Sequence, residues 1–245
     1  MLRLLSLVLF LALWSAGAAF AGARLLPGPE AVLAAILADA RTGTLFLHLG
    51  ATLARVALAF ALAMSIGTAL GILMGRSRLA DRIGDPWLVV FLNLPALVVI
   101  VLAYIWAGLT ETAAVLAVAV NKIPNAVVTV REGARALDPA LDEMARVFAV
   151  PRLRAFRHVL LPQLAPYLAA ASRAGLSLVW KIVLIVELLG RPNGVGFEIG
   201  VAFQLFDVTR ILAYALAFIA VILLIELVLV QPLERHASRW RAGPA

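Results

Sequence analysis

Two lysines lie deep in segments that are otherwise apolar enough to cross a lipid bilayer. Lys122 lies nine residues before Arg131, which at 1.5 Å per residue places it about 13 Å from the cytoplasmic interface, near the bilayer midplane. Lys181 lies about nineteen residues into another apolar segment, beside Trp180. A lone ammonium group at this depth costs about 2.5 kcal/mol or more unless it is paired or hydrated. Each lysine therefore requires an anion, a carboxylate partner or a water-filled cavity.

These lysines have two alternative roles. In the first, they pair inside the protein with Glu187 or Glu226, which also lie in or near apolar segments. Lys181 and Glu187 are six positions apart, about 240° around a helix, so they should not pair within one helix. In the second, the lysines of two chains gather near a shared axis and bind an anionic substrate such as a sulfonate, a carboxylate or nitrate. The candidate pathway residues are Lys122, Trp180, Lys181, Asn93, Tyr104, Asn121 and Glu187.

Other chemistry is missing from the sequence. The chain has no cysteine, which excludes disulfides, thiolate metal sites and cysteine nucleophiles. Its three histidines are scattered, and no HExxH, GxSxG or paired-carboxylate spacing is present, so a membrane enzyme is the weakest interpretation. No GxxxxGK(S/T) phosphate loop is present either. The chain itself is therefore expected to bind no nucleotide, metal or other cofactor.

The composition indicates the elements that must hold these residues. The 245 residues are 64% hydrophobic and 14% charged, with a mean hydropathy of +1.02, far more apolar than a soluble domain. A bilayer core about 30 Å thick requires about 20 apolar residues in a helix, because a helix satisfies its own backbone hydrogen bonds. The predicted fold class is an all-α integral membrane protein. Six segments qualify as spans: Leu4–Ala21, His48–Met74, Pro86–Ala107, Thr112–Val130, Pro162–Leu189 and Val208–Val230.

The basic residues predict how the spans are oriented. Lys and Arg gather on the cytoplasmic flanks of membrane proteins, and an even number of spans puts both termini on one side. With both termini in the cytoplasm, thirteen of the 21 basic residues flank that side. Topology thus accounts for the net charge of +7, and no nucleic-acid partner is expected. The thirteen are Arg3, Arg76, Arg78, Arg82, Arg131, Arg135, Arg146, Arg152, Arg154, Arg157, Arg235, Arg239 and Arg241.

The first apolar segment has a second interpretation as a cleaved signal peptide. Arg3 precedes it, and Ala21-Gly22-Ala23 resembles a small-residue cleavage site. Cleavage would leave five spans and place the new N-terminus outside. Residues 131–161 would be cytoplasmic in both cases.

An amphipathic segment, residues 26–47, is expected outside the membrane. A Leu-Pro-Gly-Pro break is followed by Glu30–Ala40, which has the pattern of a short helix. This helix would lie along the outer surface. Its apolar face would hold Val32, Leu33, Ile36 and Leu37.

Three glycines in the second span, Gly67, Gly71 and Gly75, recur at four-residue spacing. Such a stripe lets another helix backbone approach closely, which matters in lipid because no hydrophobic force drives helices together there. The stripe predicts packing within the chain. A seam between two copies is the alternative.

The largest soluble feature is the segment 131–161, between the fourth and fifth spans. Asp138 can cap a helix, and Pro139 can occupy its first turn. The helix would end at Pro151, and its apolar edge would dock in a groove on a soluble partner. The alternative is an ordinary connection whose arginines contact lipid phosphates. The edge comprises Leu141, Met144, Ala145 and Phe148, with Glu143 and Arg146 on its flanks.

This segment resembles the EAA loop of bacterial ABC importer permeases. Glu143, Ala145, Val159 and Leu161-Pro162 fall at the intervals of that motif. Two positions depart from it. Met144 stands where the second motif residue is usually alanine, and Ala149 where the tight turn usually has glycine.

The resemblance extends from Leu26 to about Arg235 and is to the nitrate, sulfonate and taurine branch of these permeases. The landmarks occur in the same order as in that branch. They are LPGP at Leu26–Pro29, GTALGILMG at Gly67–Gly75, EGARALDP at Glu132–Pro139, the EAA-like loop, Glu187, and GVG at Gly194–Gly196.

The resemblance implies a type I ABC importer permease fold, with about six transmembrane helices and a cytoplasmic coupling helix. Residues 1–245 would form one permease domain, with the first span in 1–25, the outer segment in 26–47 and the core in 48–235. The chain would be a multi-pass protein of the bacterial cytoplasmic (inner) membrane, and it would not itself be an enzyme. The residues implied to couple it to an ATPase are Glu143, Met144, Ala145, Arg146, Phe148, Ala149, Val150, Pro151, Leu161 and Pro162.

The resemblance also implies partners. Two copies of a cytoplasmic ABC ATPase would use ATP and Mg, and a periplasmic or extracellular solute-binding protein would deliver a small anion. A second copy of the permease would complete a homodimer, although the sequence leaves pairing with a near relative open. It also leaves open which solute is transported, because selection is expected to rest largely with the binding protein.

The main alternative function is secondary transport. The intramembrane lysines and glutamates would then carry coupling ions, and no ATPase would be needed. No inverted repeat is apparent in the six unequal spans, which argues against this interpretation.

Overall fold

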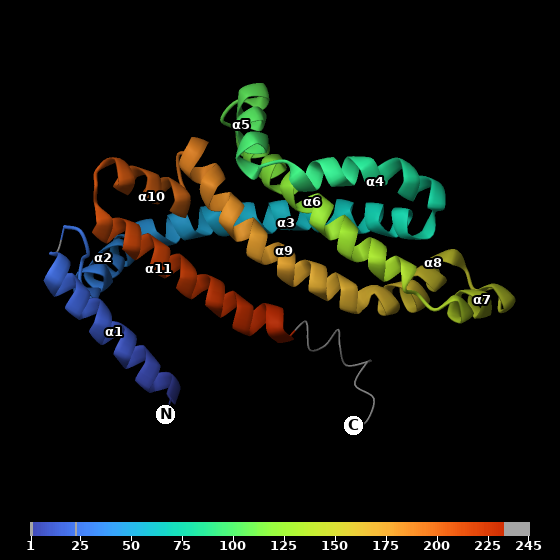
Figure 1. The fold of residues 1–245 in the computed structure, drawn as a ribbon, viewed down its shortest axis with the longest axis horizontal. Coiled ribbons are helices and arrows are strands. Elements are labelled where there is room, and N and C mark those ends of the chain that lie inside the picture. The colour runs from blue at the N-terminus through green and yellow to red at the C-terminus, as the bar shows by residue number, and fades with distance from the viewer. Residues whose placement is uncertain (1, 23, 233–245) are drawn as a thin grey trace. The chain divides into compact units, whose positions relative to one another are not determined.

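The computed structural model describes residues 2–22 and 24–232, which are built from helices and contain no strand (Figure 1). This confirms the predicted all-α class. Ala23 of the possible cleavage site and the basic residues Arg235, Arg239 and Arg241 lie outside the described residues. The elements are α1 (Leu2–Ala21), α2 (Pro29–Thr42), α3 (Thr44–Arg76), α4 (Arg78–Asn93), α5 (Ala96–Ala107), α6 (Glu111–Arg135), α7 (Pro139–Val147), α8 (Arg152–Ala155), the π-helix η1 (Phe156–Leu160), α9 (Leu161–Gly190), α10 (Val195–Gln204), α11 (Val208–Ile225) and the π-helix η2 (Glu226–Val230).

Four helical segments of the described chain are long and apolar enough to cross a bilayer, and one bent pair would make a fifth. The four are Thr44–Arg76, Glu111–Arg135, Arg152–Gly190 and Val208–Val230. Each contains one predicted span. The first predicted span is helical as α1, but its described apolar stretch, Leu5–Ala21, is shorter. At 1.5 Å per residue it extends about 25 Å, somewhat less than a typical bilayer core.

The third predicted span, Pro86–Ala107, is wrong as a single straight helix. The chain forms α4 and α5 instead, and the two helices are bent by 96° (Figure 1). The break lies at Leu94 and Pro95, which are both extended. A proline disfavours helical geometry in the residue before it, so α4 must stop there. Pro86, the predicted start, lies inside α4.

The chain packs as two compact units. One comprises Met1–Arg55 and Val183–Leu224, and the other comprises Val56–Ile182 and Ile225–Ala245. The long helices α3 and α9 contribute to both units.

In the first unit, α2 confirms the short helix predicted within residues 26–47, with Pro29 in its first turn. The indole N–H of Trp14 donates to the backbone oxygen of Pro27 at 3.0 Å, which connects α1 to the segment before α2. Among the residues of its predicted apolar face, Val32 is buried, whereas Leu33 and Leu37 are exposed.

In the second unit, the glycine stripe of α3 packs against α6, as the sequence predicts. A Cβ atom added at Gly67 would lie only 2.5 Å from the Cβ atom of Ala126. Gly71 and Gly75 meet the following turns of α6 in the same way. The stripe therefore allows close contact between two helices of one chain.

Candidate coupling segment and intramembrane charges

The predicted coupling region contains a capped helix, α7. The carboxylate of Asp138 accepts a hydrogen bond of 2.9 Å from the backbone N–H two residues on, and a proline occupies the first turn. Both features were predicted. The backbone N–H of Asp138 also donates to Oε1 of Gln163 at 3.0 Å, and Arg76 forms an ion pair with Asp142. These contacts attach α7 to the start of α9 and to the end of α3.

An apolar edge is exposed on α7 and α8. Val147 is 80% exposed and Phe148 is 75% exposed, and Met144 and Leu153 are also exposed. We call these four residues the docking edge. Ala145 was predicted to belong to it but is buried inside the protein. The sequence pattern missed Val147 and Leu153 because the apolar spacing was counted from Leu141, which is half-buried.

Helix α7 ends earlier than predicted. Its last residue is Val147, and Ala149 then adopts a left-handed conformation with φ 49°. The N–H groups of Ala149 and Val150 donate to backbone oxygens near the end of α7, at 3.0 and 2.9 Å. Such a left-handed residue closes a helix, so Pro151 instead caps the start of α8. The turn thus has the conformation that glycine favours, although alanine occupies it.

The other predicted coupling residues differ in exposure. Glu143 and Arg146 are exposed on α7, and Pro162 is exposed at the start of α9, whereas Val150 and Leu161 are half-buried. A basic surface follows the docking edge. It comprises Arg152, Arg154 and Arg157, which are exposed and pair with no carboxylate among residues 2–22 and 24–232.

An ion-pair cluster joins α4 to the C-terminal end of α6. Arg131 lies 2.6 Å from Asp85 and 3.3 Å from Asp81. Arg135 lies 2.5 Å from Asp81 and 3.0 Å from Glu132. The sequence predicted these arginines only as topological charges. Their acidic partners fix α4 against the end of α6, where the segment 131–161 begins.

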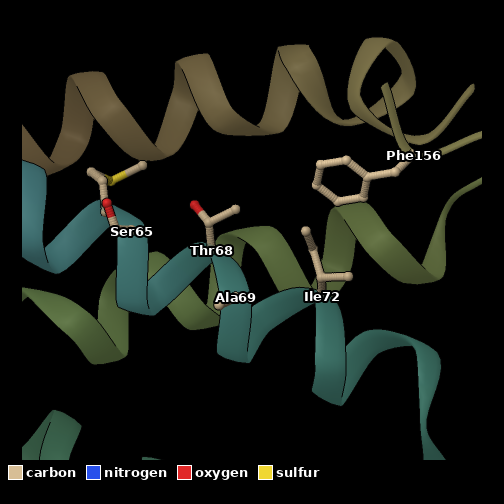
Figure 2. Close-up of a pocket in the computed structure, with 6 residues that line it drawn as sticks. Ser65, Thr68, Ala69, Ile72 and Phe156 are labelled. Carbon is tan, nitrogen blue, oxygen red and sulfur yellow. The ribbon is translucent and has the colours of Figure 1, made fainter. Parts of the chain in front are cut away.

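A groove of about 610 Å³ opens between α3 and η1, where the chain leaves the coupling segment. Figure 2 shows Phe156 opposite Ile72 and Thr68 of α3. No predicted site residue lines this groove. Its lining residues are Met64, Ser65, Thr68, Ala69, Ile72 and Phe156.

The two intramembrane lysines lie on different helices and differ in exposure. Lys122 on α6 is buried, with 1% of its surface exposed, whereas Lys181 on α9 is exposed. Within the second unit, neither lysine forms an ion pair with Glu226, which lies 3.4 Å from Arg173. In the first unit, Glu187 pairs with Arg55.

The remaining pathway candidates lie on four different helices. Tyr104 on α5 and Trp180 on α9 are buried. The side-chain amides of Asn93 on α4 and Asn121 on α6 each donate, at 2.8 Å, to the backbone oxygen four residues earlier in the same helix. Each side-chain amide thus uses one of its N–H donors within its own helix.

Glu187 is the centre of a buried polar network in the first unit. Its carboxylate accepts from Arg55 Nη1 at 2.7 Å and from the N–H of Gly196 at 2.9 Å, and it lies 2.9 Å from Thr52 Oγ1. Arg55 also donates to the backbone oxygen of Asn193 at 2.8 Å. The sequence analysis offered only the two lysines as partners of Glu187, whereas the cation that contacts it is Arg55, 132 positions away.

The same network extends to α10 and α11. His48 Nδ1 accepts from the N–H of Gly194 at 3.0 Å, and Nε2 lies 3.1 Å from Glu198. The N–H donor of the neutral imidazole must therefore be Nε2. Arg210 lies 3.3 Å from Glu198 and 3.6 Å from Asp39. The GVG landmark is thus a connection held by buried side chains.

Comparison with known proteins places these features in a family. The family described as binding-protein-dependent transport system inner membrane component matches residues 67–240. The chain belongs to this family. It is an ABC transporter permease and a multi-pass component of the inner membrane.

Relatives of this permease include proteins named for sulfur oxyanions. The aliphatic sulfonates transport permease SsuC of Bacillus subtilis is 30% identical over 233 residues, which cover 94% of this chain and 84% of that protein. The taurine transport system permease TauC of Escherichia coli is 29% identical over 221 residues, which cover 88% and 80%. A chain of the MetNI methionine ABC transporter has a TM-score of 0.68 at 19% identity, covering 82% of this chain and 99% of that one. The fold is therefore that of ABC importer permeases.

Proposed function

We propose that this permease forms the translocation pathway of an ATP-driven importer for a small anion. The sulfonate and taurine names of its relatives support this substrate class. The resemblance to the nitrate branch supports it further. The planar nitrate ion and the tetrahedral sulfonate group each spread one negative charge over three oxygen atoms. A binding protein on the outer side would deliver the solute, and a second copy of the permease would complete the pathway.

The docking edge is the observation that carries this proposal. Large apolar side chains exposed on a short, capped helix are typical of a surface that a partner covers. The partner would be the cytoplasmic ATPase, which would supply the ATP and Mg chemistry. The basic surface beside the edge would complement acidic groups around the ATPase groove. Glu143 and Arg146, on the flanks of α7, would set the orientation of docking.

The attachments of α7 explain how ATPase movement would reach the spans. A load on α7 would pass to α3 through the ion pair of Arg76 with Asp142, and to α9 through the bond of Asp138 to Gln163. The groove lined by Phe156 lies between α3 and η1, the π-helix that leads into α9. It would give α3 and η1 room to shift without overlap of side chains.

Copurification tests the docking role. The permease is co-expressed with its ATPase and binding protein and purified in detergent, as wild type and as Val147→Ala/Phe148→Ala. We expect the wild type to retain the ATPase and the double variant to lose at least 90% of it, with unchanged helix content by circular dichroism. Phe203→Ala is the matched control, because Phe203 is also an exposed phenylalanine but lies on α10. Equal ATPase retention by the double variant, or no retention by wild type, would refute the docking proposal.

A further inference from the structure

Lys122 is a buried cation without a partner. Only 1% of its surface is exposed, and its ammonium group makes no hydrogen bond or ion pair within the described chain. Five other buried side chains that carry polar or charged groups do have partners. They are His48, Thr52, Arg55, Glu187 and Glu198.

The depth of Lys122 makes this isolation costly. It lies near the middle of α6, which runs from Glu111 to Arg135. At 1.5 Å per residue, it is about 16 Å from one end of the helix and about 20 Å from the other, too far for its side chain to reach either interface. If a charged residue at the centre of a span had no function, replacing it with an apolar residue would stabilise the protein.

A glycine on the facing helix accommodates the lysine. A Cβ atom added at Gly175 of α9 would overlap Cε and Nζ of Lys122, and the next nearest atom is Cδ of the same lysine. Gly67 differs, because its close neighbours include a Cβ atom and backbone of α6. Gly175 therefore provides space for one side chain, whereas Gly67 allows two helix backbones to approach.

We propose that Lys122 is the cation that selects and binds the anionic group of the transported solute, and that Gly175 forms the recess that holds its side chain between transport events. This inference rests on the proposed import function. An ammonium group has three donors on a flexible stem, so it can leave the recess and meet an oxyanion. Binding then supplies the partner that the empty state lacks. Lys181 has no such role, since it lies about 240° around α9 from Gly175.

Accessibility of position 122 tests the proposal without knowledge of the solute. The chain has no cysteine, so Lys122→Cys carries a single thiol. The assembled permease, ATPase and binding protein are treated with 2-sulfonatoethyl methanethiosulfonate, a small anionic thiol reagent, and the mass of the permease is measured. Ala126→Cys is the matched control, because Ala126 is equally buried on α6 but packs on Gly67.

We expect Lys122→Cys to be modified during ATP turnover at least tenfold faster than Ala126→Cys. Equal, slow modification at both positions in all nucleotide states would overturn the proposal, because the solute could not reach Lys122.

Uptake tests the role of the charge. Lys122→Met, Lys122→Arg and the control Lys181→Met are compared in proteoliposomes with labelled taurine, ethanesulfonate and nitrate. We expect Lys122→Met to lose at least tenfold in uptake while it retains the ATPase and melts at the same or a higher temperature. Lys122→Arg should retain part of the uptake, and Lys181→Met should resemble wild type.

Wild-type uptake by Lys122→Met would overturn the proposal, and so would a fall in melting temperature of several degrees, which would indicate a structural role. Uptake of none of these three solutes, each of which carries a sulfonate or nitrate oxyanion group, by wild type would overturn both this role and the proposed substrate class. Loss of the ATPase from wild type would instead contradict the docking proposal, so the two failures are distinguishable.

Discussion

The guanidinium group of Arg55 donates a hydrogen bond of 2.7 Å to the carboxylate of Glu187, and both side chains are almost completely buried. The two residues are 132 positions apart. A buried ion pair is strongly interdependent, because removal of one partner leaves the other charge uncompensated. The pair therefore links α3 to α9 and, through Asn193 and Gly196, to the start of α10.

Removal of one member of this pair should be worse than removal of both. We expect Arg55→Met to destabilise the permease by about 3 kcal/mol or more, because Glu187 would be left buried without its cation. Arg55→Met/Glu187→Met should recover much of that loss. Thermal unfolding of the three proteins in the same detergent measures the difference. A double variant as unstable as the sum of the two single variants would contradict the interdependence.

Gly194 should tolerate no side chain. Its φ is +115°, and a Cβ atom there would overlap the carboxylate of Glu187. We expect Gly194→Ala to lower the melting temperature by several degrees. Gly50→Ala is the control, because nothing lies within 4 Å of that Cβ position on α3. Alanine at position 50 should leave stability unchanged or raise it by up to about 1 kcal/mol.

Ala149→Gly should stabilise the coupling segment. The left-handed conformation of Ala149 costs about 1 kcal/mol or more for a residue with a Cβ atom, and glycine avoids that cost. Glycine is also the residue that the resemblance leads one to expect there. Ala155→Gly is the opposite control, since Ala155 is helical with φ −59° and glycine should destabilise that helix by about 1 kcal/mol. Hydrogen exchange of residues 139–160 measures the effect of each substitution on local stability. Equal effects of the same sign would contradict the left-handed conformation of Ala149.

Gly71→Leu should separate α3 from α6. A Cβ atom at Gly71 would lie 2.7 Å from the Cβ atom of Val130, and larger groups have no space. We expect loss of folded protein in detergent, measured by size-exclusion chromatography. Ala61→Leu on the exposed side of α3 should have no such effect. Normal elution of Gly71→Leu would show that the two helices are not tightly packed there.

Local patterns predicted more of this structure than distant ones. The cap of Asp138 and the first-turn proline of α7 depend on neighbouring residues, so the sequence indicated both. Hydropathy located the apolar segments but missed the 96° bend at Leu94 and Pro95, because averaging over a window ignores one backbone position. Pro95 was the available signal.

The candidate sites show the same limit. The sequence identified Lys122 as costly and Glu187 as needing a partner, since burial of charge can be inferred from an apolar segment. It could not indicate that Arg55 pairs with Glu187, or that Gly175 receives Lys122, because helix packing determines those contacts. The composition of the docking edge was partly wrong for a related reason: the packed face of α7 includes Ala145, which spacing alone does not specify.

The energy source of transport distinguishes an ATP-driven importer from a secondary transporter. The permease is reconstituted with its ATPase in proteoliposomes, its binding protein is added outside, and uptake of labelled ethanesulfonate is measured with and without internal ATP. Ionophores that collapse proton and sodium gradients are included in both conditions. An ATP-driven importer predicts uptake that requires ATP and the binding protein and persists with ionophores. Uptake by the permease alone that ionophores abolish would contradict the account and favour secondary transport.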